Sequence, residues 1–234
     1  MNIVGAIPSS LSSLSSLVRL NLHSNSLFGS IPSTLGSLSR LQIIDLSYNS
    51  LTGTLPVSLQ SLVNLNQFIC YRNKLSGNPF NAMRTLSSLS LLLMDSNRFT
   101  GSISSSIDNL TKLFTLQLSN NSFNGAIPSA IGLLTGLVEL ELEANLFTGL
   151  IPDSFCNLAT LQLLTICNDN TDLLGCPHIT SVPYCVYTAT YYKQIGNLSS
   201  RTAASSMSPP SSPSAAPPPN PIGIDCTPAY GVML

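Results

Sequence analysis

Residues 110–133 read LTKLFTLQLSNNSFNGAIPSAIGL, and this stretch decides the fold because the chain repeats its pattern. Apolar residues precede Asn121 at the −11, −8, −5 and −3 positions, and Gly125, Ile127 and Pro128 follow it. Aligning the chain on this asparagine gives an anchor at every 24th residue: Asn25, Asn49, Asn73, Asn97, Asn121 and Asn145, with Asp169 in a last turn. A fixed period held over seven turns indicates a stack of repeats.

The physical chemistry of one turn supports this interpretation. A single turn cannot bury its own leucines, whereas stacked turns share a continuous core. The Leu-x-Leu segment before each anchor predicts a short strand that pairs in parallel with the same strand of the next turn. Each anchor asparagine is expected to turn inward and to hydrogen-bond backbone groups that the bend leaves without partners. Glu141 is predicted to be exposed, and four leucines are predicted to be buried: Leu20, Leu46, Leu116 and Leu142.

The Gly-x-Ile-Pro segment after each anchor predicts a back wall that is not helical. Proline cannot donate a hydrogen bond, and it disfavours a helical conformation at the residue before it. Two turns depart from the pattern, since the third reads GNPF at 77–80 and the fourth reads GSIS at 101–104. The local twist is therefore expected to change in these two turns.

The motif LxxLxxLxLxxNxLxGxIP resembles the leucine-rich repeat of plant extracellular proteins. The resemblance implies an α/β-type solenoid, a right-handed horseshoe with one parallel strand per 24-residue turn on its concave face. We assign residues 1–169 to the solenoid, 170–195 to a cysteine-containing C-terminal cap and 196–234 to a disordered tail rich in Ser, Pro and Ala. Counting back one period from Asn25 places an anchor at Met1, so we expect a fragment that begins within a repeat, without a cap or a secretory signal.

Composition excludes two classes of partner. The 9 basic and 10 acidic residues make up 8% of the chain, against roughly 25% in an ordinary soluble domain. A net charge of −1 gives no basic footprint for nucleic acid or for anionic lipid. The mean hydropathy is +0.31, yet no stretch reaches the roughly 18 to 20 uninterrupted apolar residues of a membrane span. We therefore expect neither a nucleic-acid partner nor a transmembrane segment.

Four of the six cysteines lie where the repeat decays: Cys156, Cys167, Cys176 and Cys185. They resemble the disulfide-stapled cap of secreted leucine-rich repeat proteins, and three pairings remain possible. The alternative is a zinc site that uses His178 beside Cys176, but its spacing matches no common zinc finger, so no metal is predicted. Cys70 occupies an inward strand position and is expected to be a reduced core residue. Cys226 is then left over.

The tail contains seven of the 16 prolines between Ser208 and Pro221. Such a segment favours extended polyproline II and cannot form a core. Two interpretations are open, namely an O-glycosylated stalk like that of hydroxyproline-rich glycoproteins and a plain disordered tail. Three Asn-x-Ser/Thr sequons are candidate glycosylation sites and favour secretion: Asn109, Asn120 and Asn197.

The outward strand positions, at −6, −4, −2 and −1 from each anchor, form columns whose members lie about 5 Å apart. One group in these columns is apolar and aromatic and lies beside Arg72: Ile43, Tyr48, Ile69, Tyr71, Leu91 and Leu93. A second group is acidic: Asp95, Glu139, Glu141 and Glu143. Other turns carry polar residues at the same positions, so the fold does not require the apolar ones, and we predict that both groups line a ligand-binding face. The alternative is tolerated variation on a solvated sheet.

A second interpretation of the acidic group is that its carboxylates are catalytic. Alternate residues on one strand lie roughly 6.5 to 7 Å apart, which overlaps the separation of acid and base in inverting glycosidases. An open sheet, however, gives no water-excluding cleft. His23 and His178 are expected at opposite ends of the solenoid, and the stretch from Asn168 to Asp172 lacks the glycine of a calcium loop. We predict no enzymatic activity and no cofactor.

The resemblance implies a non-enzymatic recognition module at the cell surface or outside the cell. It is similar to leucine-rich repeat receptor-like proteins and kinases and to polygalacturonase-inhibiting proteins. The implied partner is a protein, a peptide or a glycan-active enzyme. A second hypothesis is a wall-associated protein in which the proline-rich tail is the anchor and the solenoid a spacer. A third is a receptor whose transmembrane and kinase parts lie beyond Leu234.

Overall fold

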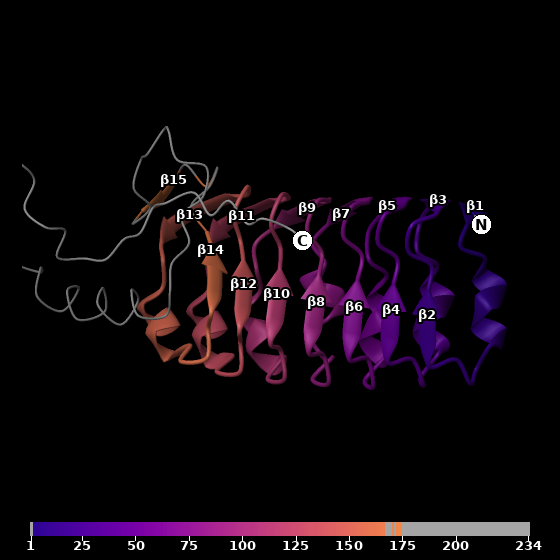
Figure 1. Ribbon diagram of the computed structural model, residues 1–234, viewed down its shortest axis with the longest axis horizontal. Coiled ribbons are helices and arrows are strands. Elements are labelled where there is room, and N and C mark those ends of the chain that lie inside the picture. The colour runs from indigo at the N-terminus through magenta and orange to yellow at the C-terminus, as the bar shows by residue number, and fades with distance from the viewer. Residues whose placement is uncertain (1, 167–169, 171, 175–234) are drawn as a thin grey trace, which may run out of the picture.

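The computed structural model describes residues 2–166, 170 and 172–174, which wind into a solenoid of stacked turns (Figure 1). Each full turn contains a strand, the inward bend at its asparagine, a second strand and a short 3-10 helix. The tail predicted for 196–234 and most of the predicted cap lie outside the described residues, as do four of the cysteines: Cys167, Cys176, Cys185 and Cys226. The side chain of Cys156 is also outside the description, so the predicted pairing of the cap remains a prediction.

One sheet has seven parallel strands and contains the Leu-x-Leu segments. Its neighbours pair 24 residues apart, so that Leu20 faces Ile44 and Leu116 faces Leu140. The strands are β2 (Arg19–Asn21), β4 (Ile43–Asp45), β6 (Gln67–Ile69), β8 (Leu91–Leu93), β10 (Thr115–Gln117), β12 (Glu139–Glu141) and β14 (Leu163–Thr165). This is the predicted sheet, with one strand per turn.

A second parallel sheet, of eight strands, was not predicted from the sequence. The segment after each anchor stays extended up to its glycine, and Gly29, for example, has a φ of +76° that ends the strand. The strands are β1 (Val4–Ala6), β3 (Ser26–Gly29), β5 (Ser50–Gly53), β7 (Lys74–Gly77), β9 (Arg98–Gly101), β11 (Ser122–Ala126), β13 (Leu146–Leu150) and β15 (Asp172–Leu174). Figure 1 shows the two sheets as adjoining sides of the solenoid.

The helices of the described residues are all short 3-10 helices, so the helical part of the predicted α/β solenoid contains no α-helix there. They are η1 (Ser9–Ser13), η2 (Ser33–Ser37), η3 (Val57–Ser61), η4 (Phe80–Ala82), η5 (Ser105–Asn109), η6 (Ser129–Leu133) and η7 (Asp153–Asn157). Pro32, with φ −70° and ψ 138°, is extended just before η2, which agrees with the predicted non-helical Gly-x-Ile-Pro segment.

The two irregular turns find different local solutions. In the third turn Pro79 adopts a helical conformation, the Asn78 side chain accepts a hydrogen bond from Phe80 N at 3.0 Å, and η4 is shortened. In the fourth turn Ser104 replaces the proline and its hydroxyl accepts from Ser106 N. A side-chain acceptor therefore satisfies the first helical N–H groups in both turns.

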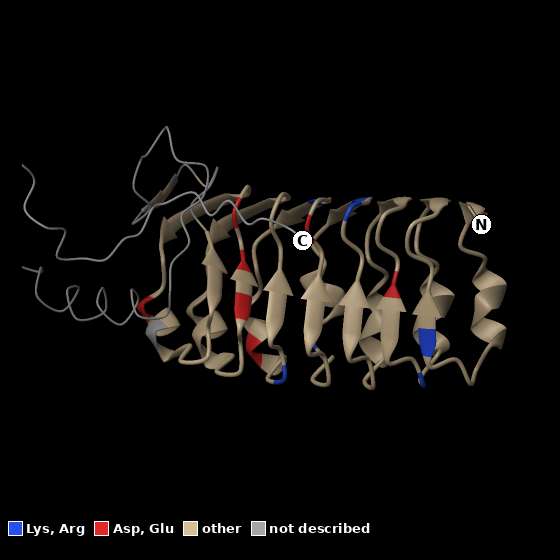
Figure 2. Cartoon of the chain, in the orientation of Figure 1, with Lys and Arg blue, Asp and Glu red and all other residues tan. Residues whose placement is uncertain are grey.

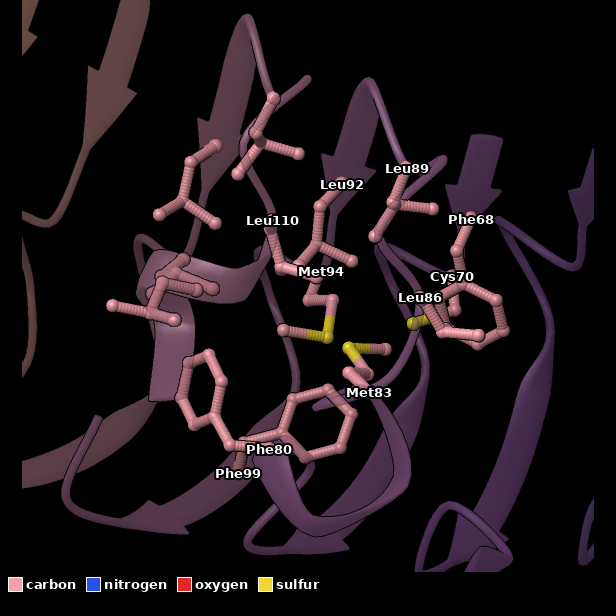
Figure 3. Packing of buried hydrophobic residues seen from close by; sticks show 14 of the residues in the cluster. Phe68, Cys70, Phe80, Met83, Leu86, Leu89, Leu92, Met94, Phe99 and Leu110 are labelled. Atoms are coloured by element: carbon pink, nitrogen blue, oxygen red, sulfur yellow. The ribbon is translucent and has the colours of Figure 1, made fainter. Parts of the chain in front are cut away.

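The core is the stack of inward side chains. Leu20 is 6% exposed, and Leu46, Leu116 and Leu142 are completely buried, as predicted. Cys70 is buried and free, and burial raises the pKa of its thiol well above the ordinary value, so the thiol stays protonated. Figure 3 shows Cys70, Met83 and Met94 pointing into the same part of the core. Three phenylalanines on neighbouring strands of the second sheet stack in the core, with ring centroids 6.1 and 6.3 Å apart: Phe99 on β9, Phe123 on β11 and Phe147 on β13.

The anchor asparagines form a ladder of hydrogen bonds between turns. The Asn145 side chain donates from Nδ2 to the carbonyl oxygens of Leu118 and Leu142, and its Oδ1 accepts from Phe123 N at 3.0 Å. The same pattern recurs one turn earlier at Asn121. Each amide thereby joins its own turn to the preceding one.

The last rung corrects the sequence alignment. Asn170, and not Asp169, donates to the carbonyl oxygens of Leu142 and Ile166 and accepts from Phe147 N. The step from Asn145 is therefore 25 residues, one longer than the period. A carboxylate has no N–H to donate, so the turn accommodates one extra residue that brings an amide into the buried position.

The ladder predicts a large loss of stability for a single amide. Asn145→Ala leaves Phe123 N–H buried without its acceptor, which is expected to lower the free energy of unfolding by about 1 to 3 kcal/mol. The measurement is the midpoint of urea unfolding. The matched control is Asn124→Ala, because Asn124 is exposed on β11, and this variant should stay within about 0.5 kcal/mol of wild type. Equal effects of the two variants would contradict the ladder.

The packing of one 3-10 helix on the next predicts a difference between two glycines. A Cβ at Gly132 would collide with the backbone carbonyl and side chain of Ser154 on η7, whereas a Cβ at Gly136 meets only Leu113 O at 3.9 Å. Gly132→Ala should therefore lower the unfolding free energy by about 1 to 3 kcal/mol, and Gly136→Ala should not. Thermal or urea unfolding of both variants tests this, and a tolerated Gly132→Ala would disprove the close approach.

Candidate ligand-binding face

The outward side of the seven-stranded sheet, here called the strand face, brings the predicted site residues into neighbouring columns. The pairing of β4, β6, β8, β10 and β12 aligns the −4 column in the order Asp45, Ile69, Leu93, Gln117 and Glu141. The same register aligns the −6 column from Ile43 to Glu139. The apolar group therefore lies on and after β4, β6 and β8, and the three glutamates lie on and after β12, with β10 between them. Asp95 follows β8, beside the apolar group.

The aromatic patch comprises the apolar group predicted from the sequence: Ile43, Tyr48, Ile69, Tyr71, Leu91 and Leu93. Tyr48 is 44% exposed, and the other five side chains are half-buried. The Tyr48 and Tyr71 rings meet edge to face, with centroids 5.1 Å apart and planes at 72°. Burial raises the pKa of the Tyr71 hydroxyl, against a hydrogen bond with Ser47 that lowers it. The patch is thus an ordered apolar surface that still reaches solvent.

Arg72 borders the patch through a repeated feature of the backbone. Tyr48 and Arg72 have φ values of 52° and 53°, and the residue before the anchor has a left-handed conformation in every turn from Ser24 to Ala144. This conformation turns the anchor inward. It also places the guanidinium of Arg72 over the Tyr48 ring, with Cζ 5.2 Å from the ring centroid.

The carboxylate strip comprises Asp95, Glu139, Glu141 and Glu143, and Figure 2 shows acidic residues gathered on β12. Gln117 joins two of these carboxylates, because its Nε2 donates to Glu139 Oε1 and to Glu141 Oε1, each at 3.1 Å. Thr115 Oγ1 donates to Glu139 Oε2 at 3.3 Å, and Ser119 Oγ donates to Glu141 Oε2 at 3.4 Å. Neutral donors on β10 and in the loop after it therefore orient the glutamates.

Three carboxyl groups of the strip have raised pKa values, so their surroundings disfavour the charged form. Burial, followed by the charge of Glu143 and the hydrogen bond and charge of Glu139, raises the pKa of Glu141 to about 7. Burial also raises the pKa of Glu143, and that of Asp95 despite the nearby Arg72. Among the described residues no cation lowers the pKa of Glu141 or Glu143. Glu143 Oε2 is buried and accepts no hydrogen bond in this part of the chain.

Two expectations about the strand face need correction. Glu141 was predicted to be exposed, but it is half-buried, because neighbouring side chains on β10 and β12 surround its carboxylate. Ser47, Thr115 and Ser119 occupy outward positions and yet are buried, at 2%, 4% and 8% exposure. Small side chains between larger neighbours are covered by them, so an outward position does not by itself give an exposed side chain.

The sequence analysis also missed three residues that organise the acidic group: Gln117, Thr115 and Ser119. Their column positions were visible in the repeat, and the register places them directly beside the glutamates. What the repeat did not show was which side chains hydrogen-bond across it, since that depends on rotamers and not on the period.

Comparison with protein-family models gives four matches to the Leucine Rich Repeat family, at residues 16–38, 40–62, 112–134 and 136–158. The solenoid is a leucine-rich repeat domain. The matched segments begin and end in the same part of successive turns, so the family repeat and the structural turn coincide. No curated protein sequence matches the chain.

Solved structures similar to this leucine-rich repeat domain include plant receptors. The ectodomain of the membrane receptor kinase GASSHO1/SCHENGEN3 from Arabidopsis thaliana, in complex with CASPARIAN STRIP INTEGRITY FACTOR 2, is 38% identical, with a TM-score of 0.67 over 69% of this chain. The Arabidopsis receptor kinase HAESA, in complex with the peptide hormone IDA and the co-receptor SERK1, is 30% identical, with a TM-score of 0.69 over 74%. The chain covers 19% and 31% of those two chains.

A third solved structure shows the fold alone. A plant ice-binding protein is 22% identical, with a TM-score of 0.54, and the match covers 76% of this chain and 81% of that one. The leucine-rich repeat fold therefore accompanies different functions, and the fold alone does not give the function of this domain.

The remaining candidate sites are the glycosylation sequons, of which Asn120 lies in the −1 column that also holds Tyr48 and Arg72. Asn109, on η5, and Asn120 are exposed, with their side chains donating to Arg84 O and Ser96 Oγ. Asn197 lies outside the described residues. Within the described ranges, no group of three or more His, Cys, Asp or Glu side chains could hold a metal ion. No helix in that part of the chain has the length and apolarity needed to cross a membrane.

The raised pKa of Glu141 predicts a stability that falls with rising pH. The unfolded glutamate loses its proton near pH 4.5 and the folded one near pH 7, so the folded state holds the extra proton in this interval. The free energy of unfolding should therefore fall between about pH 4.5 and about pH 7 and level off above that, by on the order of 1 kcal/mol after solvent screening.

The experiment compares wild type with Glu141→Gln by urea unfolding between about pH 4.5 and about pH 8. The variant should match wild type at the acidic end and exceed it at the alkaline end. Asp153→Asn, at an exposed site on η7, is the control and should follow the wild-type profile. A pH profile that Glu141→Gln leaves unchanged would refute the assignment.

Proposed function

We propose that this leucine-rich repeat domain is a non-enzymatic recognition module that binds a protein or peptide ligand on its strand face, at the cell surface or outside the cell. The observation that carries the proposal is the aromatic patch. Its members occupy positions where other turns carry Asn21, Thr115 or Gln117, so folding does not require apolar residues there. An ordered apolar and aromatic surface on an otherwise polar sheet is typical of a contact site.

The similar structures support the class of ligand. The HAESA structure contains the peptide hormone IDA, and the GASSHO1/SCHENGEN3 structure contains CASPARIAN STRIP INTEGRITY FACTOR 2. Their sequences are 30% and 38% identical to this chain in the matched regions. The domain covers only part of each of those chains. Peptide recognition here is therefore argued from the patch, with the receptors as supporting analogy.

Two alternatives have less support. A glycan-active enzyme as partner has no counterpart in these two complexes. A wall anchor formed by the proline-rich tail concerns residues outside the described part of the chain. Neither alternative accounts for apolar side chains gathered in one region of the strand face.

The test is to weaken the patch without unfolding the protein. Tyr71→Ala or Leu93→Ser should weaken binding of a partner isolated from the secreted proteins of the source tissue by about 1 to 3 kcal/mol, which is typical of an apolar anchor. Both side chains are half-buried on the outer surface, so the unfolding free energy should change by less than about 1 kcal/mol.

The readout is the dissociation constant, measured by biolayer interferometry. Ser129→Asp, at an exposed position of η6 on another side of the solenoid, is the control and should bind as wild type does. Patch variants with wild-type affinity would place the recognition surface elsewhere.

A further inference from the structure

Two carboxylates of the strip, Glu141 and Glu143, have no cationic partner within the described residues, whereas Asp95 has Arg72 nearby. Glu141 and Glu143 are half-buried, their pKa values are raised by burial, and no Lys, Arg or His lowers either value. The neutral side chains of Thr115, Gln117 and Ser119 donate hydrogen bonds to Glu139 and Glu141. Glu143 accepts a hydrogen bond from its own backbone N–H. One carboxylate oxygen, Glu143 Oε2, is buried without a hydrogen-bond partner among the described residues. Burying unpaired carboxylates lowers the stability of the fold, and a cation supplied by a ligand would offset that cost.

The nature of that cation follows from what surrounds the strip. The described residues hold no cluster of three or more side chains able to bind a metal ion, so a bare divalent ion has too few ligands. The aromatic patch lies on the same sheet, where Leu93 is two strands and Ile69 three strands from Glu141. A ligand that occupies both must be apolar at one point and cationic at another, as a peptide with a Lys or Arg is.

The strand register fixes the distance between the two contact points. Ile69 and Tyr71 are three strands from Glu141 and Glu143, and Leu93 is two strands away, which at about 4.8 Å per strand gives about 10 to 14 Å. An extended peptide that crosses the strands advances about 3.3 Å per residue, so this distance corresponds to three to four residues. Alternate residues of an extended peptide point to the same side, so only an even separation brings both side chains to the sheet.

We propose that the strand face binds an extended peptide segment in which an apolar or aromatic residue and a Lys or Arg stand four positions apart. The apolar residue packs on the aromatic patch, and the cation lies among the carboxylates of Glu139, Glu141, Glu143 and Asp95. The inference rests on the proposed function and adds the chemistry and spacing of the ligand.

The first experiment selects random linear peptides displayed on phage against the full chain, in parallel with the Glu141→Gln/Glu143→Gln double variant. Wild type is expected to enrich peptides with a basic residue four positions from an apolar one. The double variant is expected to keep the apolar preference and lose the basic one. Apolar peptides without a basic residue, enriched equally by both proteins, would overturn the inference and leave the proposed function standing.

The second experiment measures dissociation constants of the best synthetic peptide by fluorescence anisotropy. Replacing its basic residue by Glu, or moving that residue by one position, should weaken binding at least tenfold for wild type and less than threefold for the double variant. Asp153→Asn is the control for loss of a carboxylate away from the strand face and should bind as wild type does. Equal binding of the shifted peptide would overturn the spacing argument.

Proton linkage gives an independent readout of the same contact. Among the described residues, the titratable groups facing Glu141 are Glu139, Glu143 and Asp95, and the neighbouring strand β14 presents Leu163 and Thr165. A bound cation favours the charged carboxylates, so affinity should fall about tenfold from pH 8 to pH 5.5 for wild type and much less for the double variant. Failure to enrich any peptide would also overturn the inference, whereas the proposed function is judged separately by the secreted-protein partner and Tyr71→Ala.

Discussion

The fold depends on one interaction, the inward hydrogen bonding of an asparagine amide once per turn. At that point the chain bends from one sheet to the other, and the bend would leave an N–H group and several carbonyl oxygens buried without partners. The Asn145 amide satisfies Phe123 N and the carbonyl oxygens of Leu118 and Leu142, and only a side chain with both a donor and an acceptor can do so. Asn170 illustrates the strength of this requirement, because the last turn departs from the period and still keeps an amide in the buried position.

The ladder also explains why the strand face can vary. Each amide joins two turns, and the inward leucines fill the core between them, so the fold does not require a particular residue type at the outward positions. The same column can therefore hold Asp45, Leu93 or Glu141 without a change of backbone. The residues of the proposed binding face therefore occupy positions whose residue type the fold leaves free to vary.

Sequence periodicity predicted the core, the inward asparagines and the column in which each site residue lies, because all three follow from a repeat of fixed length. It did not predict the second sheet. The strands of that sheet form by backbone pairing after the bend, and their sequences lack the Leu-x-Leu pattern that marks the first sheet. It also misjudged exposure on the strand face. Ser47 and Ser119 are buried because larger neighbours cover them, and Glu141 is half-buried because Gln117 and Ser119 hydrogen-bond to it. The exposure of these side chains depends on residues of neighbouring turns, so it cannot be deduced from the sequence of one repeat.

The acidic residues of β12 oppose the stability of the free domain. Glu139 and Glu141 accept from one amide nitrogen, and burial, followed by the charges of Glu143 and Glu139, raises the pKa of Glu141 to about 7. A polar, uncharged residue in the same column, such as Gln117 one turn earlier, would avoid this cost without disturbing the register. Because neither the core nor the ladder uses these carboxylates, their stabilising role has to be sought in the bound state, where a cation from the ligand would offset both repulsion and desolvation. A local cost in the free domain that a bound cation would offset is the pattern expected if these carboxylates serve a ligand and not folding.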